Sequence, residues 1–177
     1  MGTLGTMAMD PLRELIDHLP AAELLLLLAC ANGTPILLRD LLGKRAALPL
    51  DLGYRTGAGH PWLGRSKTWR GLGGSLLVTA GVAWLLGLSP LLGLQVAALA
   101  MGGDLASSFV KRRLGIPPSG RAPLLDQLPE SLLPAWCLGP RLGLGGLEIG
   151  LVAVLFTAGE MLLSPLLYRL HIRRRPY

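Results

Sequence analysis

The longest stretch without a charged residue places the strongest constraint on the fold. No Asp, Glu, Lys or Arg occurs between Arg70 and Asp104, so residues 71–103 form an uncharged run of 33 residues. A helix crosses a bilayer with about 20 apolar residues, so this run is too long for one typical crossing. The segment Gly87–Pro90 supplies a break. We therefore expect two helices joined by a short turn, the second over Pro90–Val110 with Asp104 on its last turns.

The composition agrees with a membrane setting. Hydrophobic residues make up 51% of the 177 positions and charged residues only 16%, against about 25% charged in average chains. Aromatic residues are 5% and glycines number 24, which suits helices packed closely in lipid better than an aromatic-rich aqueous core. The two cysteines, Cys30 and Cys137, form no disulfide framework or metal motif. These values exclude an ordinary soluble domain and favour a single integral membrane domain over residues 1–177.

A second apolar run near the N-terminus predicts the first crossing. Leu24–Leu38 contains no charged residue, but it includes Asn32, Gly33 and Pro35. Proline removes a backbone donor and bends or breaks a helix. A polar amide beside such a kink is costly at membrane depth unless it faces protein or water. We expect the helix to be interrupted at this point.

The last third of the chain contains one clear run and one irregular segment. Ile149–Leu167 contains Glu160 as its only charge and is expected to form the final helix. Residues 131–147 contain two prolines, Arg141 and several glycines. The sequence by itself leaves open whether this segment crosses the membrane fully.

The distribution of basic residues decides the topology. Of the 17 Lys and Arg residues, seven lie within 39–70, four within 111–121 and four within 169–175. Short cytoplasmic loops collect Lys and Arg, and these fifteen fall on one side only if five helices cross and the N-terminus is outside. We predict an all-α polytopic helical bundle in the cell membrane, with five transmembrane helices and a cytoplasmic C-terminus. This pattern accounts for the formal charge of +6, so we expect no nucleic acid partner.

The loop between the first two helices contains a concentrated polar motif. Gly64–Gly71 reads Gly-Arg-Ser-Lys-Thr-Trp-Arg-Gly, with Lys67 and Arg70 three residues apart at the expected start of a helix. Backbone N–H groups, the helix dipole and two cations could together hold a phosphate there. The alternative is a basic flank against anionic lipid headgroups, with Trp69 as an interfacial anchor. Such flanks are common in membrane proteins.

Four polar side chains share one face of the helix that follows the break. Asp104, Ser107, Ser108 and Lys111 have the spacing i, i+3, i+4 and i+7. This spacing puts a carboxylate, two hydroxyls and an ammonium on one helical face. Polar residues at membrane depth are costly and usually functional. The alternative is an Asp-to-Lys arrangement that only ends the span.

A third cluster begins the irregular segment. Residues 123–130 read Pro-Leu-Leu-Asp-Gln-Leu-Pro-Glu. We expect Asp126 and Glu130 to lie on the same cytoplasmic side of the membrane as Asp104. Carboxylates from different segments facing a group of cations are typical of phosphoryl or nucleotidyl transfer. In such sites Mg²⁺ is held by one or two carboxylates plus substrate phosphates, and Lys and Arg stabilise the charge that develops. Helix capping is the alternative for both acids.

Together these motifs resemble the CDP-archaeol synthase family. The resemblance extends over most of the chain, from about Asn32 to Leu128. Each piece is short, but their number and order argue against coincidence. The pieces are Asn32 with Pro35, Pro49-Leu50-Asp51, the Gly64–Gly71 run, Gly103-Asp104, Ser108 to Arg113, and Asp126-Gln127-Leu128.

The resemblance implies a magnesium-dependent membrane cytidylyltransferase, distantly similar to phosphatidate cytidylyltransferase. Such an enzyme joins CTP to a membrane lipid phosphate, here of the geranylgeranylglycerol phosphate type, and releases pyrophosphate at the cytoplasmic side of the bilayer. By this resemblance Asp104, Lys111 and Asp126 would be catalytic, and Asp104, Asp126 and Glu130 would hold Mg²⁺. The residues implied in binding CTP or the lipid phosphate are Asn32, Asp51, Ser66, Lys67, Thr68, Arg70, Ser108, Arg112 and Arg113. The oligomeric state is not indicated.

One position departs from the family pattern. The family's Asp-Gln-Leu-Asp appears here as Asp126-Gln127-Leu128-Pro129, and Glu130 follows. Glu130 could replace the second carboxylate, although a shift of one residue turns a helical side chain by about 100°. A catalytically degenerate homologue that binds lipid or a membrane partner is therefore the alternative function. A transporter is a third candidate, but no internal repeat pairs the broken helices.

Overall fold

The fold is helical throughout the described part of the chain. The structure is a computed structural model that describes residues 10–56, 59–117, 120 and 122–169. These residues contain no β-strand, only two isolated bridges, so the expected all-α class is confirmed for them. The elements are α2 (Asp10–Leu42), α3 (Trp69–Leu85), α4 (Pro90–Arg113), α5 (Pro123–Leu138), the short 3₁₀ helix η1 (Gly139–Leu142) and α6 (Gly146–Arg169). Of the basic groups used above, Arg121 and residues 173–175 lie outside the described residues.

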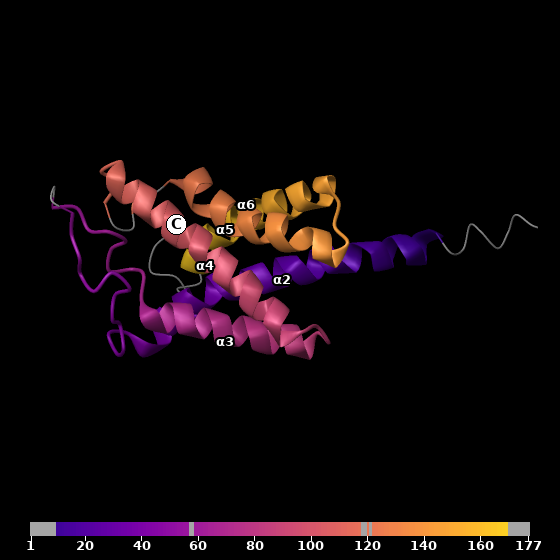
Figure 1. The fold of residues 1–177 in the computed structure, drawn as a ribbon, viewed down its shortest axis with the longest axis horizontal. Coiled ribbons are helices and arrows are strands. Elements are labelled where there is room, and N and C mark those ends of the chain that lie inside the picture. Colours follow the sequence, from indigo (N-terminus) through magenta and orange to yellow (C-terminus); the bar gives the residue numbers. More distant parts are fainter. Residues whose placement is uncertain (1–9, 57–58, 118–119, 121, 170–177) are drawn as a thin grey trace, which may run out of the picture.

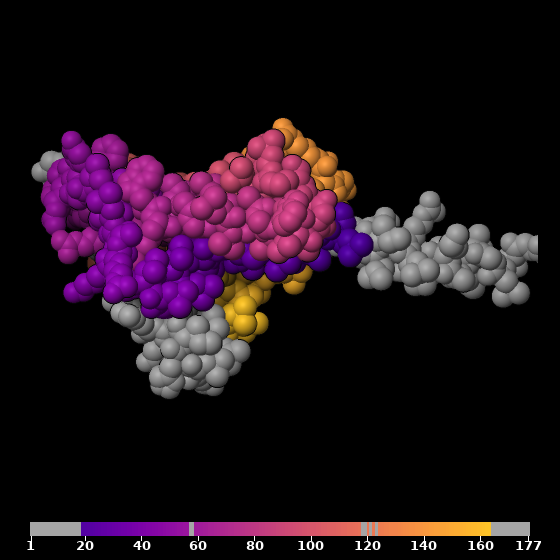
Figure 2. Space-filling view, turned by 90° about the horizontal axis from the view of Figure 1, so that it is seen from below, coloured from indigo at the N-terminus to yellow at the C-terminus, as the bar shows by residue number. Residues whose placement is uncertain are grey.

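The helices form a bundle in which each packs against the next in sequence, and α2 also contacts α4 and α6. The loop over residues 43–68 lies at one end of the bundle, and the turn between α3 and α4 lies at the other (Figure 1). Figure 2 shows the same separation from below, with the loop in purple and the turn in pink. Successive helices therefore run in opposite directions, and every second connection returns to the loop end.

Three helices are long and apolar enough to cross a membrane, namely α2 over Leu19–Leu42, α4 over Pro90–Arg113 and α6 over Gly146–Leu163. The helices α3 and α5 are shorter, at 17 and 16 residues. Large apolar side chains such as Leu77, Trp84 and Leu162 are exposed on the outer surface of the bundle. An apolar exterior of this extent marks contact with lipid, which indicates an integral membrane protein.

The predicted hairpin over residues 71–103 is confirmed. The helix α3 ends at Leu85, and Gly87 has φ +78°, a left-handed conformation that glycine adopts without steric cost. Ser89 caps α4 by accepting a hydrogen bond from the Leu91 N–H at 3.3 Å, and Pro90 occupies the first turn, where its missing donor costs nothing. The observed α4 continues three residues beyond the predicted end, to Arg113.

The predicted interruption of the first crossing is wrong, because α2 is helical through Pro35. A proline at this position leaves the carbonyl of Ala31 without its usual N–H donor four residues later. The hydroxyl of Ser75 on α3, which is fully buried, donates to that carbonyl at 2.8 Å. The neighbouring helix therefore supplies the missing hydrogen bond, and the helix continues to Leu42.

The irregular segment also differs from its predicted limits. The helix α5 begins at Pro123 and ends at Leu138, and the remaining residues form η1 and a turn with Gly143 at φ +79°. A short N-terminal turn of α6 follows, where Glu148 accepts from the Gly145 N–H at 2.7 Å. The predicted final helix is confirmed and starts three residues earlier, at Gly146.

Candidate active site

A cavity of about 360 Å³ lies at the loop end of the bundle. Residues from the 43–68 loop and from all five α-helices line it, so it depends on the whole fold. Five basic and three acidic side chains surround it, a balance that suits an anionic substrate together with a cation. The charged residues are Arg39, Lys44, Arg65, Lys67, Arg70, Asp104, Glu130 and Glu160.

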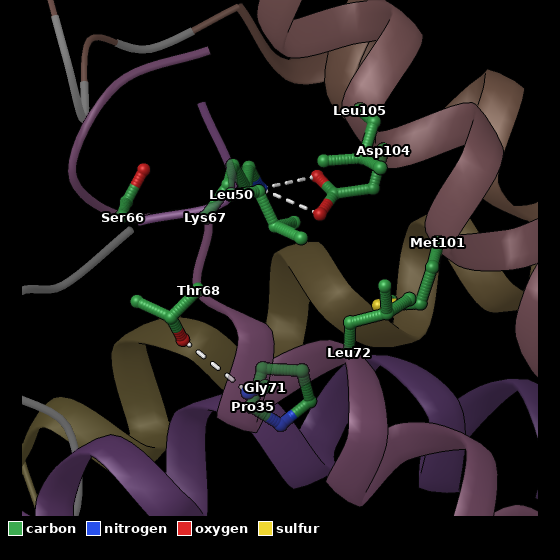
Figure 3. Close-up of a pocket in the computed structure, with 10 residues that line it drawn as sticks. All are labelled: Pro35, Leu50, Ser66, Lys67, Thr68, Gly71, Leu72, Met101, Asp104 and Leu105. Carbon is green, nitrogen blue, oxygen red and sulfur yellow. Dashed lines mark hydrogen bonds and ion pairs between the residues drawn. The ribbon is translucent and has the colours of Figure 1, made fainter. Parts of the chain in front are cut away.

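An ion pair between the loop and α4 forms part of the cavity wall. Lys67 Nζ donates to both carboxylate oxygens of Asp104, at 2.6 and 2.5 Å (Figure 3). The two side chains are only 22% and 21% exposed. The backbone around Lys67 is fixed on both sides, because its carbonyl accepts from the Leu50 N–H at 2.8 Å and Thr68 caps α3 by accepting from the Gly71 N–H at 3.3 Å. The ammonium is therefore held at the start of α3, where the helix dipole also favours anions.

Arg70 fastens the chain after α2 to the start of α3. Its guanidinium donates to the carbonyl of Gly43 at 2.8 Å and to that of Arg45. The same side chain lines the cavity. Arg70 therefore positions the loop that carries Lys44 and also contributes positive charge at the cavity wall.

Asp51 organises the loop. Its carboxylate accepts hydrogen bonds from the backbone N–H groups of Gly53 at 3.1 Å, Leu63 at 3.0 Å and Gly64 at 2.9 Å. Partial burial acts to raise the pKa of Asp51, but these N–H groups outweigh it, and the pKa lies below its ordinary value. The carboxylate closes the segment 51–64, and Asp51 is not among the residues that line the cavity.

A second polar cluster lies at the junction of α4 and α5, away from the cavity lining. Lys111 forms an ion pair with Asp126 and also donates to the carbonyl of Gly120 at 3.5 Å. Arg112 is 3% exposed and donates through Nη1 to the carbonyl of Ile116, while its Nε has no hydrogen-bond partner among the described residues. This cluster buries two cations beside one carboxylate, an excess of positive charge that suits a further anionic group.

The four polar side chains predicted to share one face of α4 are divided between the cavity and the cluster at the α4–α5 junction. Asp104 belongs to the cavity and Lys111 to the α4–α5 junction, about 10 Å further along the helix axis. Ser107 and Ser108 between them are buried, and Ser107 Oγ donates back to the Gly103 carbonyl at 2.8 Å. All four side chains are largely buried, so the face that they share points into the protein.

Arg113 lies outside the cavity lining, on the outer side of the loop. Its guanidinium lies 4.9 Å from the ring centroid of Phe109 and donates to the carbonyl of Pro61 at 3.3 Å. Trp62 packs edge-on against the same phenyl ring, with the centroids 6.1 Å apart. These contacts attach the loop to the last turns of α4, and the predicted phosphate contact of Arg113 stays a prediction.

Glu130 is the acid whose surroundings best suit a cation. It is 8% exposed and lines the cavity, and its carboxylate makes no hydrogen bond or ion pair with any described residue. The negative charges of Asp104, Glu160 and Asp126 act on it together with the positive charge of Lys67. Gly103 lets the α5 backbone come so close to α4 that an added Cβ would overlap the Pro129 carbonyl. Although Pro129 stands where the family has its second Asp, the carboxylate of Glu130 therefore lies at the cavity together with Asp104.

Seven of the predicted site residues line the cavity, five of them from α2, the loop and α3, together with two acids from α4 and α5. They are Asn32, Ser66, Lys67, Thr68, Arg70, Asp104 and Glu130. Lys111, Asp126 and Arg112 form the α4–α5 cluster, with Ser108 buried one turn before Lys111. Among the described residues, no three or more His, Cys, Asp or Glu side chains form a group that could hold a metal ion. The pairing of Asp104 and Asp126 around one ion therefore stays a prediction, while Asp104 with Glu130 is the pair that faces the cavity.

Sequence reasoning did not single out four charged residues of the cavity. Arg39 and Lys44 were counted only as topology signals, Arg65 was part of the Gly64–Gly71 motif without a role of its own, and Glu160 was noted only as the single charge of the final helix. The burial of a charge within an apolar run was the available signal for Glu160. The three basic residues carried no such signal, because basic loop residues are common at membrane surfaces.

Comparison with known proteins places the chain among membrane lipid enzymes. Residues 88–177 match the CarS-like CDP-archaeol synthase family. A CDP-archaeol synthase from Hyperthermus butylicus is 37% identical over 126 residues, which cover 68% of this chain and 68% of that protein. The corresponding protein from Aeropyrum pernix is 43% identical over 120 residues, covering 64% and 66%. The protein from Sulfolobus acidocaldarius is 32% identical over 145 residues, covering 75% and 85%.

A solved structure has a similar fold. It is described as an intramembrane enzyme for archaeal membrane lipids biosynthesis, and it matches with a TM-score of 0.63 at 33% sequence identity. The match covers 81% of this chain and 89% of the other. The likeness therefore extends over most of the chain.

Proposed function

The chain belongs to the CDP-archaeol synthase family, and we propose that it transfers CMP from CTP to a lipid phosphate of the geranylgeranylglycerol phosphate type, giving a CDP-lipid and pyrophosphate. One observation carries this function: a cavity with five cations and three carboxylates at one end of an apolar helical bundle. A nucleoside triphosphate brings several negative charges and a cation to the site, and this charge distribution accommodates both. The bundle keeps a lipid acceptor beside the same cavity.

The proposed topology has five crossings, with the N-terminus outside and the C-terminus cytoplasmic, so that the cavity faces the cytoplasm. The alternating helix directions support it, as does the position of the basic loop at the cavity end. Labelling with a membrane-impermeant maleimide tests it in a variant that lacks both native cysteines. Ser89→Cys should react in intact cells, whereas Arg55→Cys should react only after permeabilisation. The reverse pattern would contradict the proposed orientation.

We assign the Mg²⁺ ligands to Asp104 and Glu130, which both line the cavity. Asp126, the third predicted ligand, pairs with Lys111 outside the cavity lining and is not part of this assignment. The donor chemistry fits, since oxygen ligands from one or two carboxylates plus substrate phosphates suit this ion. The buried Glu130 carboxylate, which has no hydrogen-bond or ion-pair partner among the described residues, supports the assignment. When bound, Mg²⁺ would offset phosphate charge and polarise the reacting phosphoryl group.

In the proposed reaction, a phosphate oxygen of the lipid attacks the α-phosphorus of CTP, the bond to the β-phosphate oxygen breaks, and pyrophosphate leaves. Lys67 and Arg70 hold the triphosphate at the start of α3, where backbone N–H groups and the helix dipole also favour anions. The cations of the cavity stabilise the charge that passes to pyrophosphate. The rigid helices hold the two phosphates in line, which is the main contribution of protein to such transfers.

Purified protein with labelled CTP, lipid phosphate and Mg²⁺ tests the function through the amount of CDP-lipid formed. Asp104→Asn should lower the rate at least about a hundredfold, the range seen when one transition-state electrostatic contact is removed. Glu148→Gln is a matched control, because it makes the same change of acid to amide at the opposite end of the bundle. CTP binding without any CDP-lipid from the unmodified chain would favour the degenerate homologue instead.

A further inference from the structure

The tip of the loop lies beside the last turns of α4 (Figure 1). The backbone of Arg55 pairs antiparallel with that of Pro61, and the Trp62 N–H donates to the Tyr54 carbonyl at 3.1 Å. Tyr54 and Trp62 are therefore directly opposite each other, and their side chains lie on the same face of the pair. Both are exposed, at 71% and 50%, and the indole packs edge-on against the exposed ring of Phe109 on α4. Three aromatic side chains thus form one exposed surface outside the lining of the cavity.

This surface lies at the end of a lipid-facing stripe on α4. The exposed residues of that helix recur at helical spacing, which places them on one side of it. They are Pro90, Leu91, Leu94, Ala98, Ala106, Phe109, Val110 and Arg113. From Leu91 to Phe109 the stripe is apolar and about 27 Å long at the rise of an α-helix, close to the hydrocarbon thickness of about 30 Å. Arg113 is its only charge, so the boundary between hydrocarbon and headgroups falls between Phe109 and Arg113.

We propose that Tyr54, Trp62, Phe109 and Arg113 form a docking surface for the headgroup layer of an anionic membrane. Tyr and Trp rings are enriched at this level of the bilayer, because one end of each ring is apolar and the other is polar. The Arg113 guanidinium lies 4.9 Å from the Phe109 ring centroid and uses one N–H for the Pro61 carbonyl, whereas a guanidinium carries five donors. The remaining donors are available to the phosphate of a lipid, which a guanidinium fits well. This lipid belongs to the surrounding bilayer and is not the acceptor of the reaction.

The position of this surface favours a membrane over a nucleotide or a second protein. The lining of the cavity includes neither Arg113 nor the three aromatic residues, so a nucleotide in the cavity has other partners. The aromatic surface continues the apolar stripe of α4, which lipid covers in a membrane-spanning helix. The loop also supplies Lys44, Arg65 and Lys67 to the cavity wall, so docking restrains the segment that carries them. The docking requires only that the bundle spans a membrane, and it holds whether or not the chain forms CDP-lipid.

Depth-dependent quenching of Trp62 fluorescence tests the docking. A full-length variant keeps Trp62 and replaces the other three tryptophans, Trp69, Trp84 and Trp136, by Phe. It is reconstituted in vesicles of phosphatidylcholine and phosphatidylglycerol that carry bromine atoms either near the headgroups or near the bilayer centre. We expect the shallow bromines to quench Trp62 at least twofold more strongly than the deep ones. As a depth control, Leu77→Trp in a variant without other tryptophans places the ring on the exposed middle of α3 and should show the reverse order.

Two results would overturn the docking. Strong quenching of Trp62 by aqueous iodide, with none by brominated lipid, would place the loop tip in water. Quenching by neither probe would mean that protein covers the surface.

Substitution of Arg113 tests the preference for anionic lipid in the same Trp62 variant. Shallow bromines are carried either on phosphatidylglycerol or on phosphatidylcholine, at equal mole fraction. We expect the anionic lipid to quench about two to five times more strongly, the enrichment that one cation supplies at such a surface. Arg113→Gln should lower this ratio toward one, whereas Arg113→Lys keeps the charge and should retain it. Arg141→Gln removes another exposed arginine, on η1, and should leave the ratio unchanged. A ratio of one with Arg113 present, or a ratio that Arg113→Gln does not lower, would overturn the inference.

Discussion

The hydrogen bond from Ser75 to the Ala31 carbonyl should be worth more to this fold than an ordinary serine contact. Pro35 deprives that carbonyl of its donor within α2, and the Ser75 hydroxyl replaces it from α3 at 2.8 Å. Ser75 is fully buried, so water does not take over when the hydroxyl is removed. The substitution Ser75→Ala therefore leaves a buried carbonyl without a hydrogen bond.

The magnitude follows from the environment of that carbonyl. Leaving one buried polar group unpaired costs about 1–3 kcal/mol in proteins, whereas single interhelical hydrogen bonds in membranes average about 0.6 and reach about 1.7 kcal/mol. We expect Ser75→Ala to lower the free energy of unfolding by about 1–2 kcal/mol. In a Pro35→Ala background the restored N–H at position 35 donates to Ala31 instead, and the same change should cost less than about 0.5 kcal/mol by that geometry.

A double-mutant cycle measured by reversible unfolding in mixed micelles tests this reasoning. The four proteins are the unmodified chain, Ser75→Ala, Pro35→Ala and the double variant. Stability and not activity is the readout, because Pro35 also lines the cavity. A coupling energy of about 1 kcal/mol is expected. If Ser75→Ala costs the same in both backgrounds, the hydroxyl does not compensate for the proline, and the explanation of the continuous α2 fails.

Three further outcomes follow from the geometry. Gly103→Ala should destabilise the protein by about 1–3 kcal/mol through overpacking against the α5 backbone, whereas Gly102→Ala, with open space at its Cβ position, should be neutral or stabilising in the same unfolding assay. Lys67→Met should destabilise by leaving the Asp104 carboxylate unpaired, and adding Asp104→Asn should restore stability without restoring CDP-lipid formation; recovery of both would contradict the catalytic assignment. The pKa of Asp51 in the folded loop lies below its value near 4 in an open loop. The contribution of Asp51 to the stability of the loop should therefore be complete above about pH 4 and be lost as the pH falls through the folded pKa. Limited proteolysis of the loop should accelerate over that pH range in the unmodified chain and show no such step in Asp51→Asn.

The hairpin of α3 and α4 could be predicted because its signals are local. Residues Gly87–Pro90 end one helix and start the next through their own backbone conformations, independently of the rest of the fold. The continuity of α2 could not be predicted in this way. The group that compensates for Pro35 is a serine 44 residues after the affected carbonyl, and nothing in the sequence near Pro35 indicates that it will be there.

Some members of the candidate site could be predicted from the sequence, but their pairings could not. Asp104 and Lys111 were singled out because polar residues on an apolar helix are costly, and Asp126 because it adds a carboxylate from a second segment. The structure leaves all three side chains at most 28% exposed. Which ammonium meets which carboxylate depends on how α3 and α5 pack against α4, and helical spacing does not contain that information. Glu130 was offered from the sequence as a replacement for the second carboxylate, but its place at the cavity, on the segment of α5 that packs closely against Gly103, could be known only from the packing of α5 on α4.

That close approach links the packing of the bundle to the chemistry of the site. Lipid is as apolar as the helix surfaces, so membrane helices associate through small residues that let their backbones meet. At Gly103 such a contact joins α4 to α5, and the next residue is Asp104, while the α5 residues in contact are Pro129 and Glu130. The separation of the two carboxylates is therefore fixed by the same contact that holds the helices together. A side chain larger than glycine at position 103 cannot change one without changing the other, so stability and metal affinity should fall together at this position.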